Sequence, residues 1–472
     1  MTDAIVVGSG PNGLACAAAL AGAGVRVTVL EAHEQIGGGT RTSELTLPGL
    51  LHDHCSAVHP MGYGSPYLRT LGLEQHGLRW CWAPVDLAHP LDDGSAGVMV
   101  RSIEATAAGL GRDGRMWKGL FGASARAFDD ISEDTMGPLW RPPRHPLRLA
   151  RFGIPAAMPA TVLARAFRTE QARALFGGVA AHSFSPLSWP MTSAIGVAMV
   201  CAGHAYGWPV PEGGSQAIAN ALARLITEHG GTIQTGVRVG SLSELPRADA
   251  VVLDLAPRGV LEIAEGRLPA RVERAYRRYR YGPGAYKVDL AVQGGVPWRN
   301  EDCRRAGTVH VAGPLAELAR TERENNRGRL PARPMTLVGQ QYLADPTRSR
   351  DDVHPVWAYA HVPNGYAGDA TDLVIDGIER FAPGLRERIL ATSVRRTNEW
   401  EAYNANFVGG DIITGANTPW QFIVRPRLAL DPYATGIPGV FICSAATPPG
   451  GGVHGMGGYH AAQSALRHLG AG

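Results

Sequence analysis

The start of the chain places a short hydrophobic run directly before a glycine-rich turn. Residues 4–7 are apolar and mostly β-branched, which is typical of a strand buried on both faces of a parallel sheet. Gly8-Ser9-Gly10-Pro11-Asn12-Gly13 follows at once, and residues 12–23 form an alanine-rich stretch with the character of a closely packed helix. Residues 25–30 are a second apolar run. This order predicts a strand, a tight turn, a helix and a second parallel strand joined by a right-handed crossover.

The G-x-G-x-x-G spacing of the turn predicts a dinucleotide site. The first glycine permits the tight turn, the second lets a diphosphate approach the backbone, and the third lets the helix pack on the strand. The diphosphate then meets the free N–H groups and the positive dipole end of the helix. An acidic residue at the end of the second strand can accept hydrogen bonds from ribose hydroxyls and would repel a 2′-phosphate. The predicted contact residues are Gly8, Gly10, Pro11, Asn12, Gly13 and Glu31.

Two further glycine clusters favour FAD over NAD. One cluster, residues 37–39, follows the acidic strand end, where a longer cofactor continues toward its ribityl chain. The other, residues 450–452, lies between a strand-like run at 439–443 and a helix predicted over 459–469. Consecutive glycines leave backbone N–H groups unhindered next to a ligand. The contact residues predicted from these clusters are Ala32, Gly38, Gly39, Thr40, Gly451, Gly452 and Val453.

These motifs resemble those of a known group of flavoproteins. Residues 31–41 are similar to the E-A-x-x-x-x-G-G-R signature of the phytoene desaturase and amine oxidase superfamily, although Gly39 stands where the arginine is usual and Arg41 comes two positions later. Residues 448–455 resemble the H-P-G-G-G-V-x-G element that closes over the isoalloxazine, with Pro448 where histidine is common.

Further segments narrow the resemblance to the phytoene desaturase-like family of FAD-dependent oxidoreductases, in the branch of pyridine nucleotide-disulphide oxidoreductase domain-containing protein 2. They are residues 53–60, 87–94, 286–289 and 409–412, together with Arg425-Pro426. The similarity runs over essentially the whole chain. It implies that residues 237–242 are the strand whose backbone meets the adenine, with Val239 as the contact.

Three segments with nucleotide-fold character are separated by two long insertions. The middle segment has a helical pattern after Gly213-Gly214 and strand-like runs at 235–239 and 250–255. We therefore predict an α/β fold: a discontinuous FAD-binding Rossmann domain of the glutathione reductase type, with an interleaved α+β substrate domain. The FAD-binding domain is predicted to comprise residues 1–75, 206–264 and 406–472, and the substrate domain residues 76–205 and 265–405. Within the latter, residues 286–292 read as a strand and the charged residues 320–329 as an exposed loop.

Composition excludes several classes of function. The balance of 45 Lys and Arg against 42 Asp and Glu gives a net charge of only +3, which argues against a nucleic-acid partner. The six cysteines form no C-x-x-C pair, so no zinc or other metal site is predicted, and they fit a reducing, cytoplasmic compartment. No metalloprotease, hydrolase or P-loop motif is present. No run of about 18 apolar residues exists, so no membrane-spanning helix is expected.

A bound flavin accepts hydride, so the protein must hold an activated C–H bond over the ring and exclude water. The predicted function is therefore that of an FAD-dependent dehydrogenase or desaturase acting on an apolar small molecule, for example an isoprenoid. A flavin amine oxidase is one alternative, with Tyr459 and Trp420 as loose candidates for an aromatic cage. A flavin-binding interaction protein with a vestigial pocket is another. Because only one dinucleotide fingerprint is present, the expected electron acceptor is oxygen, a quinone or another compound rather than a nicotinamide.

Catalytic residues carry no clear motif, and two candidates stand out. His454 lies inside the C-terminal glycine loop and can move a proton, or it packs against the backbone. Lys287, one of only two lysines, is either a catalytic group of the substrate domain or an ion-paired strand residue. His59, His204 and His460 have less support.

Residues 139–159 combine arginines with apolar side chains and prolines. This composition has two interpretations: a solvated helix of the substrate domain, or a peripheral contact with a membrane surface near an apolar substrate entrance.

Overall fold

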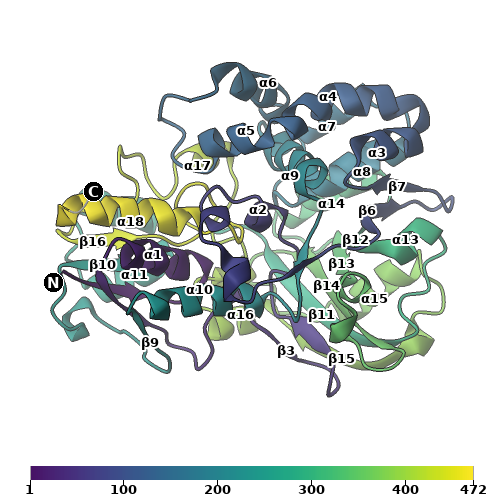
Figure 1. The fold of residues 1–472 in the computed structure, drawn as a ribbon. Coiled ribbons are helices and arrows are strands. Elements are labelled where there is room, and N and C mark those ends of the chain that lie inside the picture. The colour runs from purple at the N-terminus through teal and green to yellow at the C-terminus, as the bar shows by residue number, and fades with distance from the viewer. Residues whose placement is uncertain (1, 471–472) are drawn as a thin grey trace.

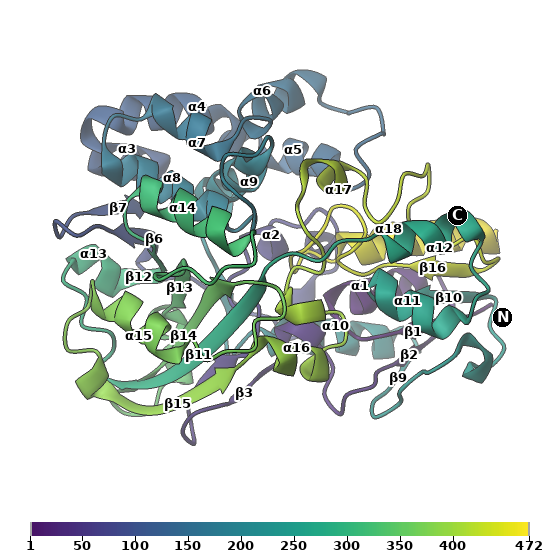
Figure 2. The same ribbon diagram turned by 180° about the vertical axis from the view of Figure 1, so that it is seen from behind.

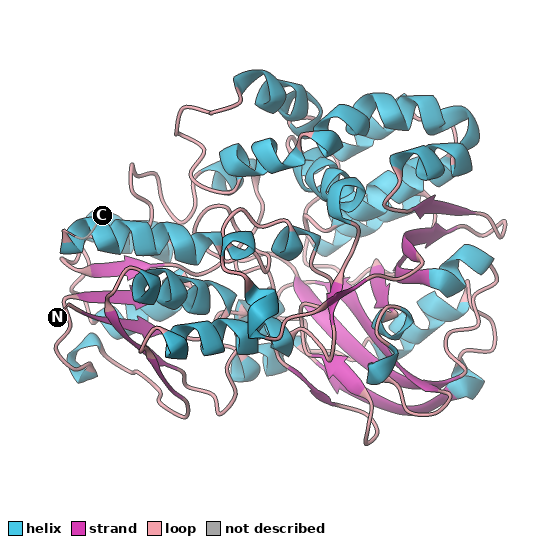
Figure 3. Ribbon diagram, in the orientation of Figure 1, coloured by secondary structure: helices cyan, strands magenta, loops and turns pink. Residues whose placement is uncertain are grey.

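The computed structural model describes residues 2–470, whose strands form two main sheets side by side (Figures 1 and 3). The smaller sheet is parallel, with the order β16 (Val440–Ile442), β10 (Ala250–Leu253), β1 (Asp3–Val7), β2 (Arg26–Leu30) and β9 (Thr232–Gln234). The larger sheet is mixed, with the order β15 (Ile389–Arg395), β11 (Gly284–Gln293), β14 (Val353–Val362), β13 (Thr336–Gly339), β12 (Ala306–Val311), β6 (Val85–Pro90) and β7 (Ala96–Met99). The predicted α/β class with a Rossmann-like domain is confirmed.

The five-stranded sheet is covered by helices on both faces. Three helices pack on one face: α1 (Pro11–Gly22), α10 (Gln216–Glu228) and α18 (Met456–Leu469). Two pack on the other, α11 (Pro257–Ala264) and α12 (Ala270–Arg277), as Figure 2 shows from behind. Both faces are therefore buried, which explains why its strands read as continuous apolar runs. All five strands come from segments predicted to form the FAD-binding domain, but the domain boundaries themselves stay a prediction.

The two faces of the seven-stranded sheet differ in chemistry. One face is aliphatic and packs against α13 (Glu301–Arg305) and α15 (Thr371–Glu379). The other carries aromatic and ionisable side chains and faces α14 (Leu315–Asn325) and a layer of helices above the sheet in Figure 1. That layer contains α3 (Ile103–Gly109), α4 (Gly114–Arg126), α5 (Phe128–Thr135), α6 (Pro146–Ala156), α7 (Ala160–Leu163), α8 (Glu170–Ala181) and α9 (Thr192–Tyr206).

Short elements connect these layers. They are β3 (Thr42–Glu44) with β4 (Leu51–Asp53), β5 (Trp80–Cys81) with β8 (Val210–Pro211), α2 (Pro60–Tyr63), α16 (Thr397–Tyr403) and α17 (Pro419–Ile423).

The charged stretch 320–329 is not the exposed loop that its composition predicted. Its first half continues α14, which begins at Leu315, and Leu318 and Glu322 of this helix are fully buried. The apolar residues that indicate the helix precede residue 320, so residues 320–329 by themselves show no helical spacing of apolar side chains.

The strand predicted at 235–239 lies earlier in the chain. β9 pairs with β2 through residues 232–234 and ends before Gly236, which has a φ of +70°. This conformation is unfavourable for other residues, so the glycine turns the chain away from the sheet. Val239 is half-buried in the irregular segment that follows and packs beneath the sheet.

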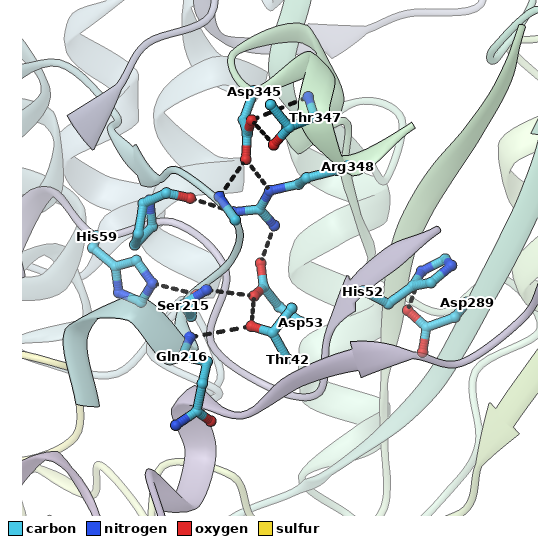
Figure 4. Close-up of polar contacts among 12 residues, drawn as sticks. Thr42, His52, Asp53, His59, Ser215, Gln216, Asp289, Asp345, Thr347 and Arg348 are labelled. Carbon is cyan, nitrogen blue, oxygen red and sulfur yellow. Dashed lines mark hydrogen bonds and ion pairs between the residues drawn. The ribbon is translucent and has the colours of Figure 1, made fainter. Parts of the chain in front are cut away.

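A buried polar network joins the two sheets (Figure 4). Arg348, between β13 and β14, donates from Nη1 to Asp53 Oδ2 at 2.6 Å and from Nε to Asp345 at 3.1 Å. Asp53 ends β4, and its Oδ1 accepts from the backbone N–H of Ser215, just before α10, and from the hydroxyl of Thr42, each at 2.7 Å. Burial alone would raise the pKa of Asp53, but the Arg348 charge and these hydrogen bonds outweigh it and hold the pKa below its usual range. The network therefore fixes the β3–β4 hairpin against both sheets.

Asp53→Asn should destabilise the protein by about 3–5 kcal/mol, because it leaves the Arg348 charge buried with one carboxylate fewer. The free energy of unfolding in urea at pH 7 measures this loss. The pKa of Asp53 is lowered on folding, so its contribution is present above the unfolded pKa and disappears as the pH falls through the folded pKa.

Asp351→Asn is the matched control, because the side chain of Asp351 is 92% exposed beside Arg350. It should change the stability by less than about 0.5 kcal/mol. Equal stability of the two variants at pH 7 would contradict the proposed role of the network.

Candidate functional site

The carboxyl ends of the parallel strands meet at one edge of the five-stranded sheet, where α1 begins. Gly8, with a φ of +98°, turns the chain out of β1, and α1 starts at Pro11 after Gly10, which has no side chain to cap the helix. A Cβ atom at Gly13 would overlap the carbonyl oxygen of Gly8. The helix and the strand therefore approach as closely as the glycine spacing predicted, and the positive dipole end of α1 at this turn favours an anion.

Glu31 lies beside this turn and is buried. Its Oε2 accepts from the backbone N–H of Ser9 at 2.9 Å and from the Ser9 hydroxyl at 2.6 Å. Its Oε1 lies 3.3 Å from Nη2 of Arg41, which is also buried. Arg41, the arginine displaced from the usual position, thus neutralises the acidic residue.

The second glycine cluster folds over the first. A Cβ atom at Gly38 would lie 3.0 Å from Cα of Gly10, and the Tyr403 hydroxyl donates to the carbonyl of Gly38 at 2.8 Å. Thr40 is buried and donates to the carbonyl of Gly37 at 2.8 Å. Ala32, by contrast, is exposed. Gly38 to Thr40 are therefore brought to the start of α1.

The first turn of α18 contacts the first turn of α1. A Cβ atom at Gly458 would overlap the carbonyl oxygen of Asn12, so only glycine fits. Two positive helix ends converge here, which favours a negatively charged ligand between them. The loop containing Gly451 to Val453 leads directly into α18.

His454 is buried in this loop, and its ring already has a backbone partner. Its Nδ1 accepts from the N–H of Met456 at 3.1 Å, and burial lowers the pKa of His454 to about 4. The imidazole is therefore neutral at pH 7, as expected for a histidine that packs against the backbone.

Lys287 points from β11 into the interior, on the ionisable face of the seven-stranded sheet. It pairs with Asp289, and its Nζ lies 5.4 Å from the ring centre of Trp357. Burial lowers the pKa of Lys287, opposed by the Asp289 charge. Tyr359 is its partner across the β11–β14 ladder.

Sequence reasoning missed a buried His–Glu pair on the same face. Nδ1 of His361 lies 2.8 Å from Glu322, and the His361 ring stacks on Phe184 at 3.9 Å between ring centres. The alternation of Trp357, Tyr359 and His361 along β14 is a signal that could have identified this face.

The remaining sequence candidates lie apart from one another. Tyr459 stacks on Tyr67, whereas the side chain of Trp420 is 70% exposed on α17. Three other histidine rings each form a hydrogen bond within the protein: His59 with the Ser215 hydroxyl, His204 with the Trp117 indole N–H, and His460 with the Met136 carbonyl. Among residues 2–470, no group of three or more His, Cys, Asp or Glu side chains could hold a metal ion.

The family described as NAD(P)-binding Rossmann-like domain matches residues 6–71. The chain is 25% identical to pyridine nucleotide-disulfide oxidoreductase domain-containing protein 2 of Rattus norvegicus, over 99% of this chain and 94% of that protein. It is 31% identical to hydroxyneurosporene desaturase of Cereibacter sphaeroides, over half of each chain. A solved structure of a putrescine oxidase double mutant has the same fold, with a TM-score of 0.62 over 99% of both chains at 17% identity.

The chain is an FAD-dependent oxidoreductase that is similar to the phytoene desaturase-like family. FAD is its cofactor, and its substrate is a small molecule. The geometry at the sheet edge fits this cofactor, because glycines at positions 10, 38 and 458 allow the start of α1, the second glycine cluster and the start of α18 to approach one another closely, which brings two positive helix ends together.

Asp254, which follows β10, is a second acidic group at the start of α1 that the sequence did not reveal. Its Oδ2 accepts from the N–H of Gly13 at 3.1 Å, and a Cβ atom at Gly10 would lie 2.5 Å from it. Burial raises the pKa of Asp254 to about 6, helped by the nearby Glu31 charge and opposed by the hydrogen bond from Gly13. Its charge therefore appears as the pH rises through about 6.

FAD should consequently bind more tightly at pH 5 than at pH 8, because ionised Asp254 repels the diphosphate. A repulsion of about 1–2 kcal/mol corresponds to roughly a 5- to 30-fold difference in Kd. Asp254→Asn should remove most of this difference, as measured by fluorescence titration of apoprotein with FAD. Glu34→Gln, a change at an exposed position, should retain it. An Asp254→Asn variant with the pH profile of the parent protein would refute the role of Asp254.

Proposed function

We propose that the chain transfers hydride between an apolar small molecule, for example an isoprenoid, and FAD. The observation that carries this proposal is the continuity of one apolar cluster with the C-terminal glycine loop. Ile412 and Ile413 pack against the cluster that contains Trp357 and Tyr359, and a Cβ atom at Gly451 would lie 3.0 Å from the carbonyl oxygen of Ile413. An apolar substrate held there would reach the loop predicted to border the flavin.

Bound FAD supplies a ring that accepts or donates hydride. We propose that the chain holds it through the residues named from the sequence: Gly8, Gly10, Pro11, Asn12, Gly13, Glu31, Ala32, Gly38, Gly39, Thr40, Val239, Gly451, Gly452 and Val453. The contacts among the glycine clusters support most of this set. Ala32 and Val239 rest on the motif alone.

Lys287 is the catalytic residue that we propose first. Its buried Nζ faces the apolar cluster, and its lowered pKa favours loss of a proton, so it can hold and release a proton next to a substrate. His454 is the second candidate, through the ring nitrogen Nε2, which takes no part in the hydrogen bond from the Met456 N–H. Phe184, Trp357 and Tyr359 exclude water from this region.

Amine oxidation is the second candidate function. Trp357 and Tyr359 lie 5.0 Å apart at 88° and offer aromatic surfaces to a cation, and the fold is shared with putrescine oxidase. The third alternative, an interaction protein with a vestigial pocket, predicts that no reductant reacts. For reoxidation we propose oxygen or a quinone.

The test is to mix the FAD-loaded protein anaerobically with a panel of apolar polyenes and a panel of primary amines, and to follow bleaching of the flavin absorbance. We expect polyenes to bleach it. Bleaching by amines alone would replace the proposal with amine oxidation, and bleaching by neither panel would favour the interaction protein.

Lys287→Met should retain FAD but slow bleaching by about 10²–10⁴-fold, the usual contribution of general acid–base catalysis. Lys118→Met is the matched control, because it removes the only other lysine, which is exposed on α4. Lys287→Arg keeps the pairing charge for Asp289 and guards against misfolding. Parent-like rates in both Lys287 variants would exclude Lys287 from catalysis.

We also propose that α6 and its flanking loop contact a membrane surface peripherally, within the reducing cytoplasmic compartment that six free cysteines favour. No helix within residues 2–470 is long and apolar enough to cross a membrane. Leu147 and Ile154 of α6, at the top of Figure 1, are 86% and 72% exposed. Arg144 and Arg148 pair with Glu133 and Asp130, so the apolar side chains rather than the charges should dominate binding.

Co-sedimentation with vesicles of phosphatidylcholine and phosphatidylglycerol tests this contact. Replacing both Leu147 and Ile154 with serine should release most of the bound protein, and replacing Arg144 and Arg148 with glutamate should release less. Leu390→Ser, at an exposed position on β15, should have no effect. Unchanged binding of both double variants would exclude this surface.

A further inference from the structure

Arg425 is a buried cation that forms no ion pair with any residue that the structure describes. Its residue is 2% exposed; Nη2 donates to Oδ1 of Asn417 at 2.6 Å and Nη1 donates to the carbonyl of Ala445 at 3.5 Å, while Nε has no partner. Within residues 2–470, no carboxylate oxygen lies within 4.0 Å of its guanidinium nitrogens. The other two arginines that are equally buried, Arg41 and Arg348, each have a carboxylate partner.

An uncompensated buried charge is costly, and proteins normally pair it. The carboxyl group that could compensate Arg425 is engaged elsewhere. Asp411 is buried near Arg425, but it accepts the N–H groups of Gly282, Gly415 and Ile413 at 2.7, 2.7 and 3.0 Å. Its own burial raises its pKa to about 6 despite the nearby Arg425 charge. The anion that balances Arg425 must therefore come with a ligand.

Arg425 lies against the C-terminal glycine loop. A Cβ atom at Gly450 would lie 2.8 Å from its Nη1, and Gly450 has a φ of +118°, so both space and backbone conformation require glycine here. This loop is the one proposed to border the isoalloxazine, whereas the diphosphate is proposed to bind at the start of α1. The position of Arg425 thus favours the flavin ring over the diphosphate as its partner.

We propose that Arg425 is the counter-charge for the reduced flavin, and that it raises the reduction potential of bound FAD. Hydride transfer from a substrate C–H bond carries two electrons and one proton to FAD, while a second proton leaves the substrate for a base or water. The ring system thereby gains one negative charge. This charge pairs with the guanidinium, which stabilises the reduced cofactor relative to the oxidised one. The inference rests on the proposed placement of FAD.

The experiment compares the FAD-loaded parent protein with Arg425→Met and Arg425→Lys. The visible spectrum first establishes that FAD is bound in each. The midpoint potential is then measured by anaerobic reduction against a reference dye, and the Kd for sulfite by absorbance, because sulfite addition also places negative charge on the flavin ring. Neither measurement needs the substrate.

We expect Arg425→Met to lower the potential and to weaken sulfite binding by at least about tenfold; a tenfold preference is equivalent to about 30 mV for a two-electron couple. Arg425→Lys should lie nearer to the parent protein. Arg427→Met is the control, because Arg427 is two residues away and donates to the carbonyl of Ala434. It should leave both quantities unchanged.

Asn417→Asp provides an independent test if Arg425→Met fails to fold. It places a carboxylate on the guanidinium without removing the arginine, and it should lower the potential in the same direction. Two results would overturn the proposal. One is an unchanged potential and sulfite Kd in FAD-loaded Arg425→Met or Asn417→Asp. The other is equal weakening of oxidised and reduced FAD, which would assign Arg425 to the diphosphate. Failure of the parent protein to bind FAD would instead refute the placement of the cofactor.

Discussion

The direct contact between the first turns of α1 and α18 is the constraint on which the cofactor site depends. Asn12 and Gly458 meet through backbone atoms, although they are 446 residues apart in the sequence. This contact requires glycine at the crossing and aligns two helix dipoles toward one point. Because α18 follows the C-terminal glycine loop directly, the same contact also sets that loop against the sheet edge where β1 and β2 end.

Buried charge is handled in two ways in this molecule. Arg348 and Arg41 are paired within the protein, so they stabilise the arrangement of chain segments whether or not a ligand is present. Arg425 and Asp254 lack such full compensation, and both lie beside glycines of the cofactor motifs. An anionic ligand would therefore compensate the charge of Arg425, whereas Asp254 makes the binding of such a ligand depend on pH.

The backbone of the cofactor site could be predicted from the sequence because steric demands leave residues of a single type. Gly8, Gly13 and Gly38 mark positive φ angles or close approaches, and the apolar strands mark burial on two faces. Side-chain pairing leaves no such mark. Asp254 and Glu322 have neighbours from distant segments, so sequence reasoning missed them, and it noted Arg425 only as part of a family motif, without a role. The predictions for residues 320–329 and 235–239 were wrong for a local reason: the hydrophobic residues of α14 and β9 lie just before these two segments.

The order of strands in the parallel sheet also constrains how the protein is made. β1, α1 and β2 can form early, but β10 joins β1 only after some 250 residues have been synthesised, and β16 and α18 come almost 200 residues later. Long-range pairing of this kind is slow and leaves strand edges unpaired meanwhile. On the ribosome, the nascent N-terminal unit therefore has an unpaired sheet edge, and its glycine turn lacks the contact with α18, until the segment that contains β16 and α18 emerges. This interval is when a chaperone would have most to protect.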